Sequence, residues 1–527
     1  MSKAADLAKT STKAGFHYLW GLVVSTIISS LGTIFIANLL GSEAYGLYSI
    51  ALTLPTIIMI FRDWGITSAM VRYTAQYRAE NRTAEIRSIF VAGIVFELVL
   101  GIILSLVSFL ISGYVATDFY NRPEVAPLIQ IASISILAHG LTTAATAVFT
   151  GTEETTYNSV MLICQSAIKT LLIIGLVLVG LGTSGAIMGF AISSMVAGFV
   201  GVTFVTFLYR RVPQAFSQKL EVKEYTKEML KYSIPLSLVT ILSGFLAQFY
   251  VLLLPYFYSD NSLIGNYYAA LNFVVLISFF ALPITAMLFP AFSKLDIKKD
   301  KAAIKNVYQF SVKYSSLLVV PVAALVMCLS GPAVTTLFGN SYSSAPLFLS
   351  LLAISYLFTA TGNLSTGNII NSQGQTKMNM KFTLLTAAIG FPMGYFLIMH
   401  YGVFGLIFTS IVAPVPSLIL SLLWIKKHYD LSVDWGSSAK ILASSAIAAT
   451  LTYLLVSFTS FASIIELFIG AVFYVLVLIA ALLLTRTLSL TDLNSLRTMT
   501  TGLGPVSKLV GIILSTLERI MIKFRLS

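Results

Sequence analysis

Long apolar runs separated by short polar segments make up most of this chain. Each run of roughly 20 apolar residues is long enough to cross a lipid bilayer as a helix. We therefore expect an all-α polytopic membrane protein with about 14 transmembrane helices. The runs lie near 15–38, 44–70, 88–111, 127–150, 159–181, 184–208, 232–257, 264–290, 314–330, 346–370, 382–400, 403–425, 440–458 and 462–485.

Composition supports this class. Of the 527 residues, 57% are hydrophobic and only 10% are charged, and the mean hydropathy is +0.88. Soluble domains average about 25% charged residues, so a soluble fold is excluded. The first run, from about 15 to 40, is too long for a signal-peptide core and is read as an uncleaved helix. Cys164 and Cys328 lie inside apolar runs, where they are typical of small buried side chains rather than of a disulfide or a metal site.

The positive charges indicate an orientation. With the N-terminus in the cytoplasm, all but Arg122 and Lys169 of the 33 Lys and Arg residues fall on the cytoplasmic side. The net charge of +12 is thus explained by the placement of Lys and Arg on the cytoplasmic side of the membrane, and it does not indicate a nucleic-acid partner. We expect a multi-pass protein of the cytoplasmic (plasma) membrane with both termini inside.

One segment has a weaker copy later in the chain. Gly46–Leu52 aligns with Gly265–Leu271, and further matches continue 219 to 221 residues apart into the fourth helices of the two halves. Two copies with an even number of spans enter the membrane from the same side, and the substrate site of such parallel repeats lies between them.

This repeat predicts the domain organisation. We expect an N-terminal six-helix lobe and a C-terminal six-helix lobe around a central cavity, joined by a cytoplasmic linker and followed by two additional helices and a cytoplasmic amphipathic tail. The expected bounds are 1–210 and 232–426 for the lobes, 211–231 for the linker, 427–486 for the added helices and 487–527 for the tail.

The sequence resembles a known family at three places. Residues 41–48 (GSEAYGLY), 63–73 (beginning DWGI and ending RY) and 371–377 (NSQGQTK) are similar to the polysaccharide transporter, or oligosaccharide flippase, family. That family belongs to the multidrug/oligosaccharidyl-lipid/polysaccharide flippase superfamily. The resemblance covers roughly residues 10–485. It implies two six-helix lobes around a cavity and alternating access to a polyprenyl- or dolichyl-linked oligosaccharide.

Three polar side chains lie near the middle of apolar spans of the first half. Counting about 1.5 Å per residue from the inner ends places Glu97, His139 and Lys169 at similar depth. One interpretation is a cluster lining the cavity, in which Lys169 attracts a lipid diphosphate or acidic sugar and Glu97 or His139 titrates or binds a coupling cation. The alternative is a structural Glu97–Lys169 ion pair.

Arg62 and Asp63 stand side by side in the second apolar run. If the helix ends near 64 they are interfacial anchors, and if it continues to 77 they project into the cavity. We favour the cavity, because charge facing lipid at that depth is disfavoured. Arg72 is interpreted as a contact at the cytoplasmic entrance or as a plain positive-inside residue.

The second half has no charge in its six spans. Its amides, including Gln248, Asn272 and Asn363, suit sugar hydroxyls, although amides also form hydrogen bonds between packed helices. Helix packing is the better explanation for most of them.

Together these features predict a flippase that moves a lipid-linked oligosaccharide and is not an enzyme. The alternative is a cation-coupled exporter of small amphiphiles of the multidrug and toxin extrusion type. Expected partners are the lipid-linked substrate, membrane lipids and, as candidates, glycan-assembly enzymes. We expect no cofactor and no metal. Without a nucleotide-binding loop, ATP hydrolysis is not expected, and the energy source stays open.

Overall fold

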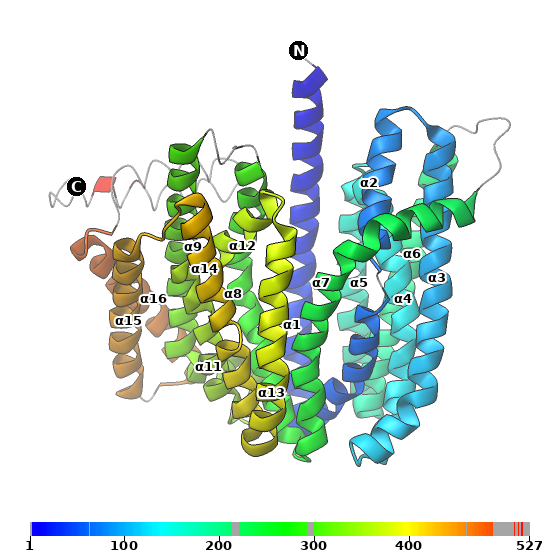
Figure 1. Cartoon of the computed structure of the whole chain (residues 1–527). Coiled ribbons are helices and arrows are strands. Elements are labelled where there is room, and N and C mark those ends of the chain that lie inside the picture. The colour runs from blue at the N-terminus through cyan, green and yellow to red at the C-terminus, as the bar shows by residue number, and fades with distance from the viewer. Residues whose placement is uncertain are drawn as a thin grey trace. The chain divides into compact units, whose positions relative to one another are not determined.

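The structure is a computed structural model, shown in Figure 1. It describes residues 3–62, 64–212, 221–293, 295, 300–459 and 461–487, with isolated positions at 511, 515, 518 and 519. The side chains of 3–19, 234–236, 238–239, 282–291 and 293 are outside this description. The predicted amphipathic tail therefore lies outside the described residues, apart from those four positions.

The described residues form helices joined by short turns, and none of them is in a strand. The α-helices are α1 (Lys3–Ile60), α2 (Ile66–Ala79), α3 (Thr83–Tyr114), α4 (Ala126–Gly151), α5 (Thr155–Leu176), α6 (Gly182–Arg211), α7 (Val222–Phe257), α8 (Asn261–Ser293), α9 (Lys301–Cys328), α10 (Ser330–Phe338), α11 (Ala345–Leu357), α12 (Asn363–Ser372), α13 (Thr376–Val412), α14 (Val415–Tyr429), α15 (Trp435–Ser457) and α16 (Ser463–Leu484). The π- and 3₁₀-turns are η1 (Val115–Phe119), η2 (Pro123–Val125), η3 (Val177–Leu181) and η4 (Phe358–Thr361).

The apolar helices confirm a multi-pass membrane protein. Within the described residues, 10 helical runs are long and apolar enough to cross a membrane, or 11 if the pair bent by 55° around Gly362 is one span. The run Thr155–Arg211 has 57 residues, about 85 Å of helix, whereas the hydrocarbon core is about 30 Å thick. It contains a glycine with non-helical backbone dihedral angles, Gly180. Two other long helices contain such a glycine, which is Gly41 in α1 and Gly402 in α13. The count of about 14 spans stays a prediction.

Contacts along the chain define two compact units. The first comprises residues 1–272, 337–344 and 383–413, and the second comprises 273–336, 345–382 and 414–527. In the second unit, α15 packs on both α9 and α16, and Tyr474 of α16 donates a 2.7 Å hydrogen bond to the carbonyl of Pro321. The division into six-helix lobes stays a prediction. Its expected linker at 211–231 overlaps α7, which already begins at Val222.

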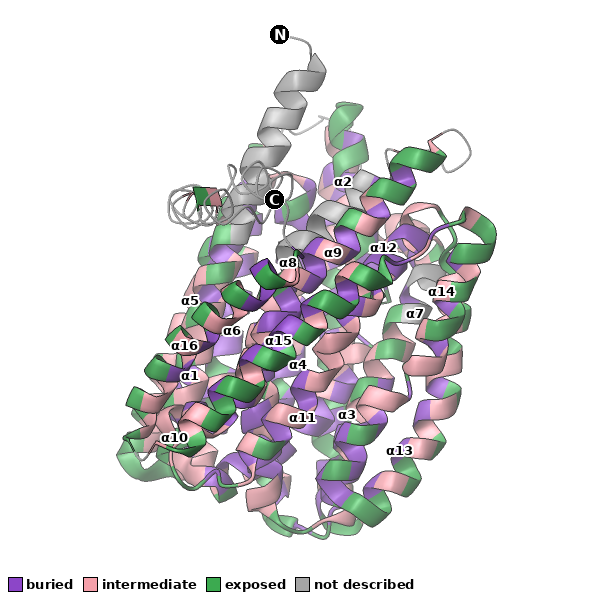
Figure 2. Ribbon diagram, turned by 90° about the vertical axis from the view of Figure 1, so that its left-hand side faces the viewer, coloured by how far each residue is buried: buried purple, intermediate pink, exposed green. Residues whose placement is uncertain are grey.

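In the first unit, small residues let helices approach closely. α1 packs along α5, where Gly21 faces Ser159 and Gly32 faces Thr170, and α4 packs on α3 and on α6. Such small-residue crossings are typical of helix packing in lipid, where apolar side chains provide no driving force for association. Large apolar side chains are exposed in this unit, among them Leu171, which is 72% exposed. Figure 2 colours the exposed residues of each helix green.

The two copies of the repeat meet inside the first unit. A Cβ atom built on Gly46 would lie 3.0 Å from the backbone nitrogen of Gly265, and a Cβ on Gly265 would lie 3.0 Å from the backbone nitrogen of Gly46. Beside them, the hydroxyls of Ser42 and Ser262 are 2.7 Å apart. Residues matched by the sequence repeat thus contact each other reciprocally, as related positions do at a two-fold crossing. We therefore interpret this crossing of α1 and α8 as a pseudo-two-fold contact.

Candidate functional site: a buried ion pair at a helix break

The second apolar run contains a break that the sequence did not indicate. α1 ends at Ile60, and α2 begins at Ile66 after Gly65, which has φ 80° and ψ 8°. Only glycine adopts this left-handed conformation without strain. The helix therefore ends close to 64, as one of the two sequence alternatives has it, and does not continue unbroken to 77. Arg62 lies in the break, and Asp63 is outside the described residues.

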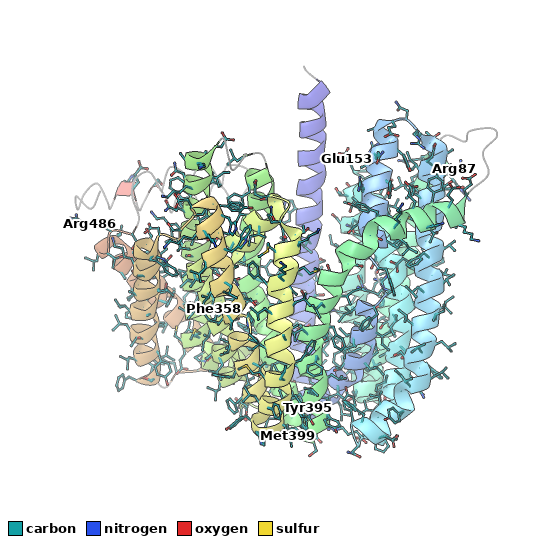
Figure 3. All side chains as sticks on the ribbon, in the orientation of Figure 1. Arg87, Glu153, Phe358, Tyr395, Met399 and Arg486 are labelled. Carbon is teal, nitrogen blue, oxygen red and sulfur yellow. The ribbon has the colours of Figure 1, made fainter. Side chains whose placement is uncertain are left out.

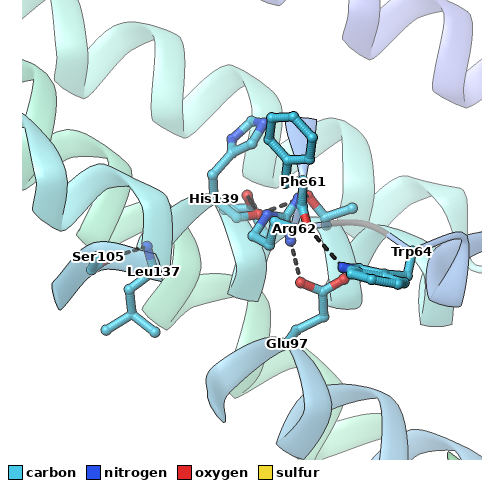
Figure 4. A network of polar contacts seen from close by, with 9 residues as sticks. Phe61, Arg62, Trp64, Glu97, Ser105, Leu137 and His139 are labelled. Atoms are coloured by element: carbon cyan, nitrogen blue, oxygen red, sulfur yellow. Dashed lines mark hydrogen bonds and ion pairs between the residues drawn. The ribbon is translucent and has the colours of Figure 1, made fainter. Parts of the chain in front are cut away.

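Arg62 forms a buried ion pair with Glu97 of α3, shown in Figure 4. The two side chains are only 4% and 0% exposed. The Nη2 of Arg62 donates a 3.0 Å hydrogen bond to the hydroxyl of Thr143, and that hydroxyl donates to the carbonyl of His139 at 2.7 Å. The Nε of Arg62 has no hydrogen-bond partner among the described residues. Two helices, α3 and α4, therefore provide partners for one guanidinium group.

Gly140 provides the space for this pair on α4. A Cβ atom at this position would lie 3.3 Å from Nη1 of Arg62 and 3.4 Å from Oε2 of Glu97. Neither Gly140 nor Thr143 was among the residues expected from the sequence. For Thr143 the available signal was its position four residues after His139, because residues three or four apart share one face of a helix.

The residues next to the ion pair are more exposed than the pair itself. His139 is exposed, and Phe61 and Trp64, which flank Arg62 in the break, are 41% and 44% exposed. The indole nitrogen of Trp64 donates a 2.8 Å hydrogen bond to the carbonyl of Phe61 (Figure 4). The arrangement offers an arginine behind two aromatic side chains, a combination that can hold an anionic group next to apolar or sugar surface.

Lys169 has a different partner. Its ammonium donates a 3.1 Å hydrogen bond to the hydroxyl of Ser29 on α1, whereas Glu97 pairs with Arg62. The sequence alternative of a Glu97–Lys169 ion pair is therefore wrong. Counting residues gave the depth of both side chains but not the direction in which each one points.

Arg72 belongs to a charged end of the first unit. It is exposed, and its guanidinium lies 4.2 Å from the ring centroid of Tyr232. Arg82 nearby pairs with Glu80 and Glu85. Figure 3 shows Arg87 and Glu153 at the same end of the unit. The role of Arg72 at a cytoplasmic entrance stays a prediction.

The side chains of this charged end have shifted pKa values. Hydrogen bonds from Gln76 and Arg82 lower the pKa of Glu80. Burial raises the pKa of Tyr77, on the neighbouring α2, to about 12. Both shifts favour the forms that these groups already have around neutral pH, which are charged for Glu80 and neutral for Tyr77.

The three predicted sugar contacts have different surroundings. Asn272 donates a 3.0 Å hydrogen bond to the hydroxyl of Tyr45 and a 2.9 Å bond to the carbonyl of Tyr268, which favours the helix-packing interpretation. Gln248 is half-buried on α7. Asn363, in the second unit, is exposed at the start of α12. A role of these amides in sugar binding stays a prediction.

The fold is shared with solved structures of membrane transporters. The structure of the lipid II flippase MurJ in an inward closed conformation superposes with a TM-score of 0.69 at 17% identity, over 87% of this chain and 97% of that chain. An inward-facing multidrug resistance MATE family transporter of the MOP superfamily superposes with a TM-score of 0.63 at 14% identity, over 77% and 94% of the two chains.

Residues 35–347 match the family described as "Polysaccharide biosynthesis protein", and the chain belongs to this family. It is also similar to the probable low-salt glycan biosynthesis flippase Agl15 of Haloferax volcanii, with 22% identity over 90% of this chain and 94% of that protein. An uncharacterized membrane protein of Methanocaldococcus jannaschii, MJ1068, is 22% identical over 79% of this chain and 85% of its own length. The resemblance noted in the sequence is thereby confirmed at the level of the family.

Proposed function

We propose that this protein is a flippase for a lipid-linked oligosaccharide, whose carrier is a polyprenyl or dolichyl phosphate or diphosphate. It moves the lipid from the inner to the outer leaflet of the cytoplasmic membrane for polysaccharide or glycoprotein glycan assembly. It works by alternating access and catalyses no reaction of its own. Both termini lie in the cytoplasm, on the side of the lysines and arginines.

The buried Arg62 is the observation that supports this proposal most. A charged side chain inside an apolar helix bundle is costly, and such residues mark substrate or ion pathways. Arg62 also lies where a spanning segment is broken, which is where transporter sites form. A guanidinium group matches the oxygens of a phosphate better than an ammonium does. The relative Agl15 is named as a probable glycan biosynthesis flippase, which agrees with a lipid-linked oligosaccharide as the substrate.

Glu97, His139 and Lys169 remain candidate cavity residues, and so does Asp63. In this proposal Arg62 holds the phosphate, and the exposed Phe61 and Trp64 face the adjoining sugar or isoprenoid. The crossing of α1 and α8 at Gly46 is a contact that alternating access would open.

Leaflet-resolved transport in proteoliposomes tests the function. A lipid-linked oligosaccharide in the outer leaflet is digested by an added glycosidase, and the purified full chain should speed digestion of the inner pool. Arg62→Gln should slow transport about ten- to hundredfold, the equivalent of one or two charge-assisted hydrogen bonds. Arg82→Gln is the matched control, because Arg82 is an exposed arginine with acidic partners of its own.

The proposal fails if the lipid is untouched. If a small organic cation instead moves along a proton or sodium gradient, the protein is an exporter of the multidrug and toxin extrusion type. Lys169→Ala belongs in the same series. If Lys169→Ala loses transport while Arg62→Gln transports normally, the anion is bound by Lys169 and not by Arg62.

A further inference from the structure

Six exposed lysines of the second unit lie at the ends of three helices. None of them forms a hydrogen bond or an ion pair through its side chain with a residue that the structure describes. In the first unit, by contrast, the exposed Arg82 pairs with both Glu80 and Glu85. The lysines are Lys301 and Lys305 at the start of α9, Lys377 and Lys381 at the start of α13, and Lys426 and Lys427 at the end of α14. We call them the lysine surface.

One apolar cluster holds these helix ends together. It contains the buried Ile304 and Ile425 and, packed against them, the partly buried Met378. Each of these three residues is next in the chain to a member of the lysine surface. Successive residues of a helix point about 100° apart, so the neighbour of a buried residue can reach the exposed side. The six lysines therefore surround a single core, and they form one surface.

This surface carries an excess of positive charge. The segments 300–310, 376–382 and 424–435 contain the six lysines and three acidic residues, which are Asp300, Asp430 and Asp434. One of the carboxylates is already engaged, because Asp434 accepts hydrogen bonds from the backbone N–H and the hydroxyl of Ser437. The ammonium groups outnumber the carboxylates, and an anionic partner is the one that such a surface attracts.

Exposed apolar side chains show what kind of partner lies there. On α14, Leu423 is 56% exposed one turn before Lys427, and on α9, Phe310 is 52% exposed five residues after Lys305. Large apolar side chains exposed on membrane-spanning helices lie against acyl chains. Trp435, at the start of α15, is 58% exposed, and tryptophan is enriched at the boundary between headgroups and hydrocarbon. The lysines therefore lie at the level of the lipid headgroups.

From this placement we infer that the lysine surface binds anionic phospholipid headgroups in the leaflet at its end of the unit. In the orientation proposed above, this is the cytoplasmic leaflet, whose anionic lipids attract basic segments next to the membrane. A lysine ammonium is a compact charge without the fixed fork of a guanidinium, so the surface selects negative charge and not one particular headgroup. This inference goes beyond the proposed function and does not depend on which lipid is transported.

Electron paramagnetic resonance of spin-labelled lipids tests it in phosphatidylcholine vesicles that contain the purified full chain. The probe is labelled phosphatidylglycerol, and labelled phosphatidylcholine with the same acyl chains is the neutral reference. The motionally restricted fraction of each label measures how much lipid lies on the protein. Phosphatidylglycerol should be enriched about two- to fivefold at about 0.1 M salt. The enrichment should fall towards one at about 1 M salt, where the Debye length is only about 3 Å.

Removing one lysine from each helix locates the binding surface. The variant Lys305→Gln/Lys381→Gln/Lys427→Gln should lower the enrichment about twofold. A matched control removes the same number of exposed lysines from α7, where lysines alternate with glutamates and the local charge is balanced. This control, Lys223→Gln/Lys227→Gln/Lys231→Gln beside Glu221, Glu224 and Glu228, should keep the wild-type enrichment.

Two results would overturn the inference. If the wild-type chain shows no preference for phosphatidylglycerol, the lysine surface does not bind lipid, and a protein or nucleic-acid partner becomes the better explanation. If the test variant and the α7 control lose the same share of the enrichment, total charge and not this surface is responsible.

A second measurement covers the case in which the test variant does not fold. Phosphatidylglycerol with a photoreactive group on its headgroup is cross-linked to the wild-type chain, and the labelled peptides are mapped by mass spectrometry. Peptides with residues 301–305, 377–381 and 426–427 should carry the label, and labelling confined to other basic segments overturns the inference. Neither assay contains a lipid-linked oligosaccharide, so the flippase proposal is tested separately.

Discussion

Adding a single methyl group at the crossing of α1 and α8 should separate the two helices. A Cβ on Gly46 would lie 2.8 Å from the carbonyl carbon of Asn261, and a Cβ on Gly265 would lie 2.9 Å from the carbonyl carbon of Ser42. Non-bonded carbons prefer about 3.5–4.0 Å, so the helices must move apart by about 1 Å. These neighbours are backbone atoms, which cannot turn aside as a flexible side chain can. We expect Gly46→Ala and Gly265→Ala each to cost about 1–3 kcal/mol.

The double variant carries the sharper prediction. Once one methyl group has separated the helices, the second meets space that is already open. The cost of Gly46→Ala/Gly265→Ala should therefore be smaller than the sum of the single costs by about 0.5 kcal/mol or more.

Unfolding of the solubilised full chain in a titration with sodium dodecyl sulfate, followed by tyrosine and tryptophan fluorescence, measures these costs. Gly175→Ala on α5 is the matched control, because a Cβ there meets nothing within 4 Å. It should be neutral or stabilising by about 0.5–1 kcal/mol, since alanine is the better helix former. The reasoning is refuted if Gly46→Ala is as harmless as this control, or if the two single costs simply add.

Three further predictions concern other contacts. Ser42→Cys/Ser262→Cys should form a disulfide, because the two hydroxyls are 2.7 Å apart, and the oxidised protein should lose transport until a thiol reductant restores it. Arg62→Gln should destabilise the protein by about 3–5 kcal/mol, whereas Arg62→Gln/Glu97→Gln should cost less because it leaves no uncompensated buried charge, a difference that the same unfolding titration measures. Asp434→Ala should cost about 1 kcal/mol, because Asp434 caps α15 through the backbone N–H of Ser437. Since the Ser437 hydroxyl holds the pKa of Asp434 below its usual value, this stabilisation should be present above about pH 4 and fade as the pH falls through the lowered pKa, which a pH series of unfolding measures.

The sequence alone was enough for the class of protein, because hydropathy and the cost of an unpaired backbone in lipid act segment by segment. The sequence also contained the repeat. Gly46 and Gly265, which the repeat aligns with each other, are in reciprocal contact in the structure. The cost of charge in lipid was sufficient to select Arg62, Glu97 and Lys169 as unusual.

Only the tertiary structure decided which of these charges meet. The depth of a residue follows from counting along its helix, but its direction depends on rotation about the helix axis, which changes by about 100° per residue. Arg62 lies between the end of α1 and the start of α2 and pairs there with Glu97, and the absence of a side chain at Gly140 makes room for the pair. Lys169 meets Ser29 instead, because α5 packs along α1. Partner choice depends on contacts between distant segments, which hydropathy and helical spacing do not encode.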